Sequence, residues 1–213
     1  MNPTDRIEGL LSGIPEAYPH LRVEPEPAEG SISLVGAFPV RHEGQDVERF
    51  FIRMLVPLDF PQQWPQVWET AGRIPHIMRR HVNLSNGSLC VLLPEEAFLT
   101  LPPAITLLEY LDGPLRHYFI GQLCVEQDQP WPWGEHEHGP SAIIEFYRKF
   151  LNLDDDDKII TVLHHVWKGR YKGHWPCPCG SGHIIRKCHL GQMNTIKNRI
   201  PKTLLYSYFN KTY

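Results

Sequence analysis

Apolar residues at every second position between Leu21 and Val56 constrain the fold of this chain more than any other feature of its sequence. The segments LRVEP, SISLVGAF and RFFIRMLV each show this alternation, which is the period of a β-strand with one buried face. Their succession predicts an antiparallel meander. A proline-rich bend, PLDFPQQWPQVWE, then leads into a fourth short strand near Val67.

Helical patterns lie on both sides of these strands. Residues Thr4–Ser12 have apolar side chains at helical spacing and a capping threonine at their start. After an irregular segment from Arg73 to Leu101, residues 104–123 return to a helical pattern that is interrupted at Asp112–Pro114. Another helix is expected from Ser141 to Leu151. This order predicts an α+β fold, in which helices cover one face of a four-stranded antiparallel sheet.

Length and charge suggest how the chain is organised. With 213 residues, of which 42% are hydrophobic, it can bury a core. Four consecutive aspartates, Asp154–Asp157, repel one another and stay solvated, so we place a boundary there, between a domain of residues 1–153 and an extension of residues 158–213. The first residues lack the apolar stretch of a signal peptide, and no apolar run is long enough to cross a membrane, so we expect a cytoplasmic protein. A net charge of −3 gives no global basic field, so duplex nucleic acid is not an expected partner.

Cys90 lies in the irregular segment, after the polar turn SNG. A thiol that exchanges acyl groups with another thioester needs exposure and an oxyanion donor more than a strongly lowered pKa. Asn83 offers a side-chain amide seven residues earlier, and the turn lets the chain fold back to bring the two together. The alternative is a buried cysteine, which is the commoner fate of this residue between two aliphatic neighbours. We assign Cys124 to that class.

Motifs between Phe60 and Thr106 resemble those of the ubiquitin-conjugating (UBC) enzyme family. FPQQWP is similar to the family's proline bend, HVN to its histidine-proline-asparagine triplet, NGSLC to its cysteine turn, and LPPAIT to the start of its central helix. The order of helices and strands over roughly residues 1–151 also matches. The resemblance implies a UBC-like fold and Cys90 as the thioester-forming nucleophile. It further implies that Asn83 steadies the oxyanion or the active-site loop, and that His81 is structural.

The sequence departs from the family's pattern at three points. Val82 replaces the proline of the triplet, Trp64 replaces the first of two paired prolines, and the spacing from His81 to Cys90 is one residue short. These departures resemble the bacterial relatives found in antiphage (CBASS) and ubiquitin-like operons. That resemblance implies a partner with an exposed C-terminal glycine tail, either a nucleotidyltransferase akin to cyclic GMP-AMP synthase or a ubiquitin-like protein. The sequence has no phosphate-binding glycine loop, so a separate activating enzyme would be needed if the tail is activated at all.

A second group of reactive side chains lies in CPCGSGHIIRKCH. Cys177, Cys179, Cys188 and His189 are ligands at short spacing that suit tetrahedral zinc. The run resembles the SEC-C zinc motif in its cysteine-histidine form, over residues 174–191. Four protein ligands leave no open position, so the zinc would be structural and would supply folding energy to a small extension. The basic and aromatic residues around it suit an acidic protein surface or single-stranded nucleic acid, and we favour the protein.

Three functions remain open at this point. The first is a ubiquitin-conjugating-like acyl transferase that carries a partner's C-terminal carboxylate on Cys90. The second is a non-catalytic UBC-fold module that binds a partner's C-terminal tail. The third is an adaptor that recruits other proteins through its zinc motif. A cysteine-histidine hydrolase using Cys90 and His81 is disfavoured, because residues so close on one turn rarely form such a dyad.

Overall fold

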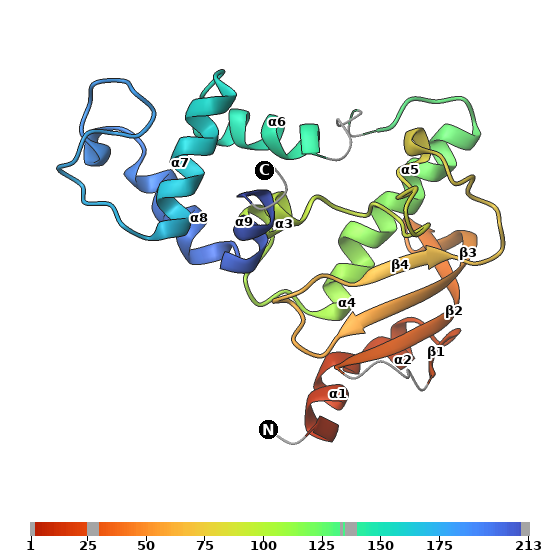
Figure 1. Cartoon of the computed structure of the whole chain (residues 1–213). Helices are drawn as coiled ribbons and strands as arrows, with labels where there is room; N and C mark the ends of the chain where they lie inside the picture. The colour runs from red at the N-terminus through yellow and green to blue at the C-terminus, as the bar shows by residue number, and fades with distance from the viewer. Residues whose placement is uncertain (1–2, 25–29, 133, 135–139, 210–213) are drawn as a thin grey trace. The chain divides into compact units, whose positions relative to one another are not determined.

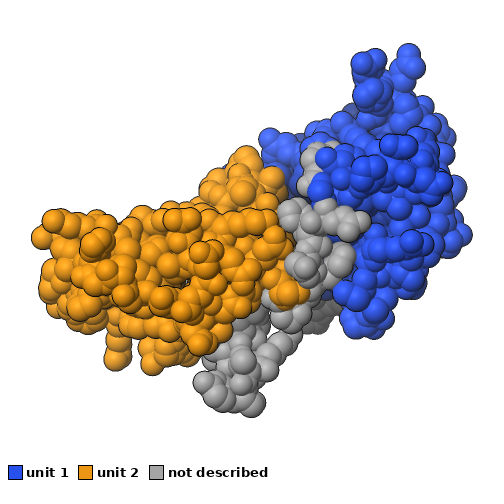
Figure 2. Space-filling view, turned by 90° about the horizontal axis from the view of Figure 1, so that it is seen from above, with its two compact units in different colours: residues 1–92, 104–135 blue, residues 93–103, 136–213 orange. Residues whose placement is uncertain are grey.

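The computed structural model describes residues 3–24, 30–132, 134 and 140–209. Two compact units are present, and Figure 2 colours them separately. Unit 1 comprises residues 1–92 and 104–135, and unit 2 comprises residues 93–103 and 136–213. The predicted α+β class is confirmed, because the chain contains a four-stranded antiparallel sheet and several helices. Within the described residues, no helix combines the length and the apolar character needed to cross a bilayer.

Unit 1 contains the predicted meander. The strands follow one another in the sheet in sequence order, and each pair is antiparallel (Figure 1). They are β1 (Leu21–Glu24), β2 (Ser31–His42), β3 (Gln45–Pro57) and β4 (Gln66–Glu69). The alternation in the sequence is reproduced in the burial of β3, where Phe50, Ile52 and Met54 are buried and Phe51 is 53% exposed. The apolar face of the meander therefore forms the core of unit 1.

Helices cover the buried face of this sheet. In Figure 1 the helical run from α4 (Leu107–Tyr110) to α5 (Arg116–Glu126) crosses it, and Phe119 of α5 stacks on Phe50 of β3 with ring centroids 4.4 Å apart. Such aromatic pairs stabilise a core beyond the area that they bury. The shorter elements of unit 1 are α1 (Pro3–Leu11), α2 (Ile14–Ala17) and the 3₁₀ turn η1 (Met78–Arg80).

The predicted interruption at Asp112–Pro114 is a π-helical turn. This turn, η2 (Leu111–Leu115), joins α4 and α5 without a break in the helical path, so the expected end of one helix and start of another is wrong. Pro114 has no N–H and cannot extend the regular hydrogen-bond ladder, and the wider π turn accommodates it. Thr106 begins the run with a capping box, in which its hydroxyl accepts from the Glu109 N–H and the Glu109 carboxylate accepts from the Thr106 N–H.

Unit 2 is helical and has a core of its own. Its elements are α3 (Pro94–Thr100), α6 (Pro140–Leu151), α7 (Asp156–Lys168), the 3₁₀ turn η3 (Ile185–Lys187), α8 (Leu190–Arg199) and α9 (Lys202–Phe209). Asp155 caps α7 by accepting a hydrogen bond from the Lys158 N–H. Tyr147 and Leu151 of α6 are buried in the same cluster as Ile159 and Val162 of α7. Helix α6, which was predicted to lie in the first domain, therefore packs with the C-terminal residues.

Candidate functional site

The Cys90 turn, residues 81–90, is a short antiparallel loop. The Asn83 N–H donates to the Ser88 carbonyl oxygen at 2.8 Å, and the Cys90 N–H donates to the His81 carbonyl oxygen at 2.7 Å. Val82 and Leu89 form the bridge between the two arms, and both are buried. Asn83 and Cys90, which flank this bridge on opposite arms, are both exposed.

Strand β4 holds this turn in place. The Leu89 N–H donates to the carbonyl oxygen of Val67 at 2.7 Å, and the indole N–H of Trp68 donates to the carbonyl oxygen of Asn86 at 3.0 Å. Gly87 has a φ of +70°, and a Cβ there would lie 2.9 Å from the ring of His76. Only glycine fits this position without displacing a neighbour. The turn is therefore a fixed extension of the sheet edge.

The side chain of Asn83 stabilises the turn itself. Its amide Nδ2 donates to the Ser88 hydroxyl at 2.9 Å, and that hydroxyl donates to Oδ1 of Asn86 at 2.9 Å. Asn86 Oδ1 also accepts from the Ser88 N–H at 3.1 Å. Asn83 thus steadies the loop in this structure. The amide carries a second N–H, which an oxyanion on the exposed side could use.

His81 is buried and helps to hold the turn in place. Its backbone is left-handed, with φ 51°, and its ring lies against Trp131 with centroids 4.4 Å apart. The Tyr118 hydroxyl donates to the carbonyl oxygens of Arg80 at 3.0 Å and of His81 at 3.3 Å. The carbonyl oxygen of His81 therefore accepts from both Tyr118 and Cys90, so helix α5 is connected directly to the backbone of Cys90.

A buried polar group extends this support along α5. Gln122 donates to the carbonyl oxygen of Arg80 at 2.6 Å and accepts from the Arg80 guanidinium at 2.6 Å. Glu126 forms an ion pair with Arg80 at 3.5 Å. The sequence prediction missed these residues, although Tyr118, Gln122 and Glu126 recur every four positions along α5. That spacing on one helical face is the signal that could have identified them.

Cys90 is exposed, as an acyl acceptor requires. Protein atoms nevertheless crowd its sulfur, and this desolvation raises the pKa of the thiol above the ordinary value of 9.0. A thiolate at Cys90 would also raise the pKa of the buried Tyr118, to which burial contributes most. The site thus presents an accessible sulfur that is mostly protonated at neutral pH.

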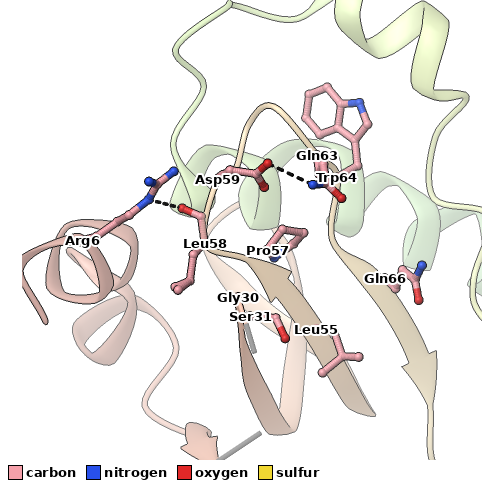
Figure 3. Close-up of a pocket in the computed structure, with 10 residues that line it drawn as sticks. All are labelled: Arg6, Gly30, Ser31, Leu55, Pro57, Leu58, Asp59, Gln63, Trp64 and Gln66. Atoms are coloured by element: carbon pink, nitrogen blue, oxygen red, sulfur yellow. Dashed lines mark hydrogen bonds between the residues drawn. The ribbon is translucent and has the colours of Figure 1, made fainter. Parts of the chain in front are cut away.

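A cleft of about 520 Å³ opens beside the sheet in unit 1 (Figure 3). Its lining combines apolar residues of β3 with the charged or amide side chains of Arg6, Asp59 and Gln63, and Gln63 donates to Asp59 at 2.9 Å. Cys90 does not line the cleft. Gln66 does, and it precedes Val67, whose carbonyl oxygen accepts from Leu89. Neighbouring residues of β4 therefore belong to the two features: Gln66 lines the cleft, and Val67 is hydrogen-bonded to the Cys90 turn.

Unit 2 brings together the four predicted metal ligands. The sulfurs of Cys177, Cys179 and Cys188 and a ring nitrogen of His189 all lie within 4.8 Å of one another. Nδ1 of His189 is 3.3 Å from the sulfur of Cys177 and 3.1 Å from that of Cys188. Three thiols and an imidazole at these separations could hold a metal ion, and the donor set is the one that zinc prefers.

The surroundings of this cluster favour metal binding. Nε2 of His189 is 2.9 Å from the carbonyl oxygen of Leu151, so it donates there and leaves Nδ1 free of its proton to face the sulfurs. Burial raises the pKa of Cys177 to about 12. Against the effect of burial, hydrogen bonds from Ser181 lower the pKa of Cys179 to about 6. These hydrogen bonds favour the thiolate form of Cys179, which is the form that binds a metal ion.

No protein family model matches this sequence, and neither a curated protein nor a solved structure shows significant similarity to it.

Proposed function

We propose that this chain is a UBC-like acyl carrier in which Cys90 accepts the C-terminal carboxylate of a partner protein as a thioester. The observation that supports this best is the exposed Cys90 thiol at the end of a turn whose backbone is fixed by His81 and by β4. A nucleophile must be both reachable and held in place, since small misplacements cost large factors in rate.

The proposed reaction has two transfers. First, the Cys90 sulfur attacks the activated carbonyl carbon of the partner's tail, the C–S bond forms, and the leaving group departs with its electron pair while the thiol proton passes to it or to water. An amine of the acceptor then attacks the same carbon. A C–N bond forms, the C–S bond breaks, and the amine's proton neutralises the departing Cys90 thiolate. In each transfer Asn83 would donate its second amide N–H to the oxyanion.

The raised pKa of Cys90 suits exchange with another thioester. An attacking thiol and a leaving thiol with similar pKa values make the transfer nearly isoenergetic. A thiol of lower pKa would ionise more readily, but its thiolate would be a poorer nucleophile. Activation of the tail therefore belongs to a separate enzyme. By the resemblance described above, the passenger is a glycine-ended nucleotidyltransferase or ubiquitin-like protein, and the setting is bacterial antiphage defence.

We further propose that Cys177, Cys179, Cys188 and His189 hold a structural zinc ion, as the resemblance to the SEC-C motif implies. When bound, the ion would close a loop that otherwise has few apolar residues to bury. This chain contributes the ligands, the His189–Leu151 hydrogen bond that fixes the imidazole, and the tight turn at Gly180 with φ +75°.

The direct test is to trap the acyl intermediate. The full chain, loaded with zinc, is incubated with a candidate partner, its activating enzyme and ATP. We expect a thiol-sensitive adduct with the wild type, a thiol-resistant ester with Cys90→Ser and no adduct with Cys90→Ala. Cys124→Ala is the matched control and should behave as the wild type. If Cys90→Ala still forms the adduct, Cys90 is not the acceptor.

The cleft beside β4 favours a second function, a non-catalytic module that binds a partner's tail. In this cleft Arg6 would pair with the C-terminal carboxylate of the partner's tail. Leu55 would contact an apolar side chain of the tail, and the Gln66 amide would bond to its extended backbone (Figure 3). A tail peptide should then bind Cys90→Ala as tightly as the wild type, and Arg6→Glu should weaken it about tenfold. Loss of peptide binding in Cys90→Ala would argue against this function.

A further inference from the structure

The charges of this chain are sorted along its sequence. Residues 158–213 contain ten lysines and arginines and neither an aspartate nor a glutamate, so all 24 carboxylate side chains lie in residues 1–157. The net charge of −3 hides this asymmetry. A segment with so many cations and no internal anions attracts a polyanion from outside.

Part of this charge gathers on one surface of unit 2. The backbone N–H of Arg186 donates to the carbonyl oxygen of Gly173, and that of Ile185 donates to the carbonyl oxygen of Trp175, both at 2.9 Å. These bonds hold η3 beside residues 172–175. Gly173 makes the approach close, because a Cβ there would lie 3.2 Å from the Cβ of Arg186.

Helix α8 adds to the same surface through Tyr171. The Tyr171 hydroxyl donates to Oδ1 of Asn194 at 3.0 Å, and the Lys197 ammonium lies 5.7 Å from the centre of the Tyr171 ring. Lys172 lies 6.0 Å from the centre of the Trp175 ring. Three separate segments thus contact one another, and we define their basic and aromatic residues as the basic surface: Tyr171, Lys172, Trp175, Arg186 and Lys197.

The cations of the basic surface have no acidic partners. Lys172, Arg186 and Lys197 are exposed, and none of them forms an ion pair with another residue that the structure describes. The Trp175 side chain is 40% exposed. Exposed tryptophan beside unpaired cations is the combination that binds a strand of phosphates and unstacked bases.

We propose that the basic surface binds single-stranded nucleic acid. The three cations would contact successive phosphates, and the indole of Trp175 would stack on a base. A duplex keeps its bases stacked and leaves Trp175 unused. An acidic protein surface would also satisfy the cations, but it gives the exposed aromatic ring no planar partner. This proposal is independent of Cys90 and goes beyond the acyl-carrier function.

The test is fluorescence anisotropy of the zinc-loaded full chain with a fluorescein-labelled 20-nucleotide oligothymidine. We expect saturable binding that weakens with salt, with a log–log slope of about −2 for three phosphate contacts. Lys172→Glu, Arg186→Glu and Lys197→Glu should each weaken binding about tenfold. Trp175→Ala should weaken it at least about fivefold through the lost stacking. Arg22→Glu, an exposed change on β1, is the control and should leave the affinity unchanged, as should Cys90→Ala.

Three results would overturn the proposal. They are no oligonucleotide binding at low salt, equal affinity for the matching duplex, and unchanged affinity in Trp175→Ala. Binding of polyglutamate without binding of oligothymidine would instead assign the surface to an acidic protein. Zinc content and circular dichroism of each variant separate a lost contact from a lost fold. If a charge reversal fails to fold, the corresponding glutamine variant should still weaken binding severalfold.

Discussion

The backbone amide of Cys90 and the hydroxyl of Tyr118 donate to the same carbonyl oxygen, that of His81. This shared acceptor connects helix α5 to the turn that presents the thiol. The Tyr118 hydroxyl is buried, and so is the Arg80 carbonyl oxygen to which it also donates. Each carbonyl oxygen has a second donor, the Gln122 amide for Arg80 and the Cys90 N–H for His81. Removing the Tyr118 hydroxyl therefore takes away one of two donors at a buried position, which should matter for stability and for the position of Cys90.

Tyr118→Phe should therefore lower the free energy of unfolding by about 1–2 kcal/mol and slow acylation of Cys90 severalfold. Tyr110→Phe is the matched control, because the Tyr110 hydroxyl is buried without a hydrogen-bond partner among the described residues. That change should be neutral or stabilising. Urea unfolding of both variants, with the rate of Cys90 modification by a maleimide, measures the two effects. Equal destabilisation of the two variants would contradict the role given to Tyr118.

Gly87→Ala should disturb the Cys90 turn by two routes. The left-handed backbone costs alanine about 1–2 kcal/mol, and the added Cβ would meet the His76 ring. Gly44→Ala isolates the first route, because Gly44 has φ +80° and open space around its Cα. We expect similar losses of unfolding free energy from backbone strain, with an additional loss and an altered maleimide rate at Cys90 only in Gly87→Ala. An unchanged rate there would mean that the turn tolerates the displacement of His76.

The pH dependence of Cys90 alkylation follows from its surroundings. Burial raises its pKa above 9.0, so the thiolate is a small fraction at pH 7 and grows about tenfold per pH unit up to that pKa. We expect the rate constant for iodoacetamide at Cys90, followed by peptide mass spectrometry, to rise throughout pH 7–9. A plateau below pH 8 would show that the thiol is activated instead. The Cys90→Ala variant measures the alkylation that comes from the other cysteines.

The strands and the cluster of three cysteines and a histidine could be predicted because each depends on local spacing. Period-two alternation determined the meander, and ligands separated by one and by eight residues necessarily meet if the turn between them is tight. The path of the helix through Pro114 could not be predicted, because a proline usually ends a helix, whereas here the π turn accommodates it and buries Leu111 and Leu115.

Hydrogen-bond partners that are far apart in the sequence could not be predicted either, because tertiary packing brings them together. Arg80 and Gln122 are separated by 42 residues, and only the packing of α5 under the turn brings them together. The pairing of Asn83 with Ser88 depends on the register of the loop, and a shift by one residue would place Asn83 on the buried side. Glu95 is a further example, because tertiary packing buries this carboxylate while the neighbouring Glu96 stays partly exposed.

The proposed zinc site gives a prediction with a close internal control. His189→Ala should abolish tight zinc binding and lower the melting temperature of the chain, because it removes one ligand and leaves three thiols. His183→Ala changes an exposed histidine in the same loop and should do neither. Zinc content by colorimetric titration and melting curves with and without a chelator measure both. If His189→Ala retains stoichiometric zinc, the fourth ligand lies elsewhere.

Glu95 in α3 makes the stability of unit 2 depend on pH. Its side chain is fully buried, its carboxylate has no hydrogen bond to another residue that the structure describes, and its charge acts on the buried Tyr147 hydroxyl. Burial raises the pKa of Glu95 from 4.5 to about 7. The unfolded chain therefore releases this proton at lower pH than the folded chain does. Stability is lost as pH rises from about 4.5 to about 7, and the loss reaches about 3 kcal/mol above that range.

Glu95→Gln should remove this loss, since the amide cannot ionise. The gain in unfolding free energy over the wild type should be about 2 kcal/mol larger at pH 8 than at pH 5.5, measured by urea unfolding with zinc present at both values. Glu96→Gln lies on the same helix but is partly exposed, and its effect should not vary in this way. A pH-independent difference between Glu95→Gln and the wild type would mean that Glu95 stays ionised inside the fold and that an unseen partner satisfies it.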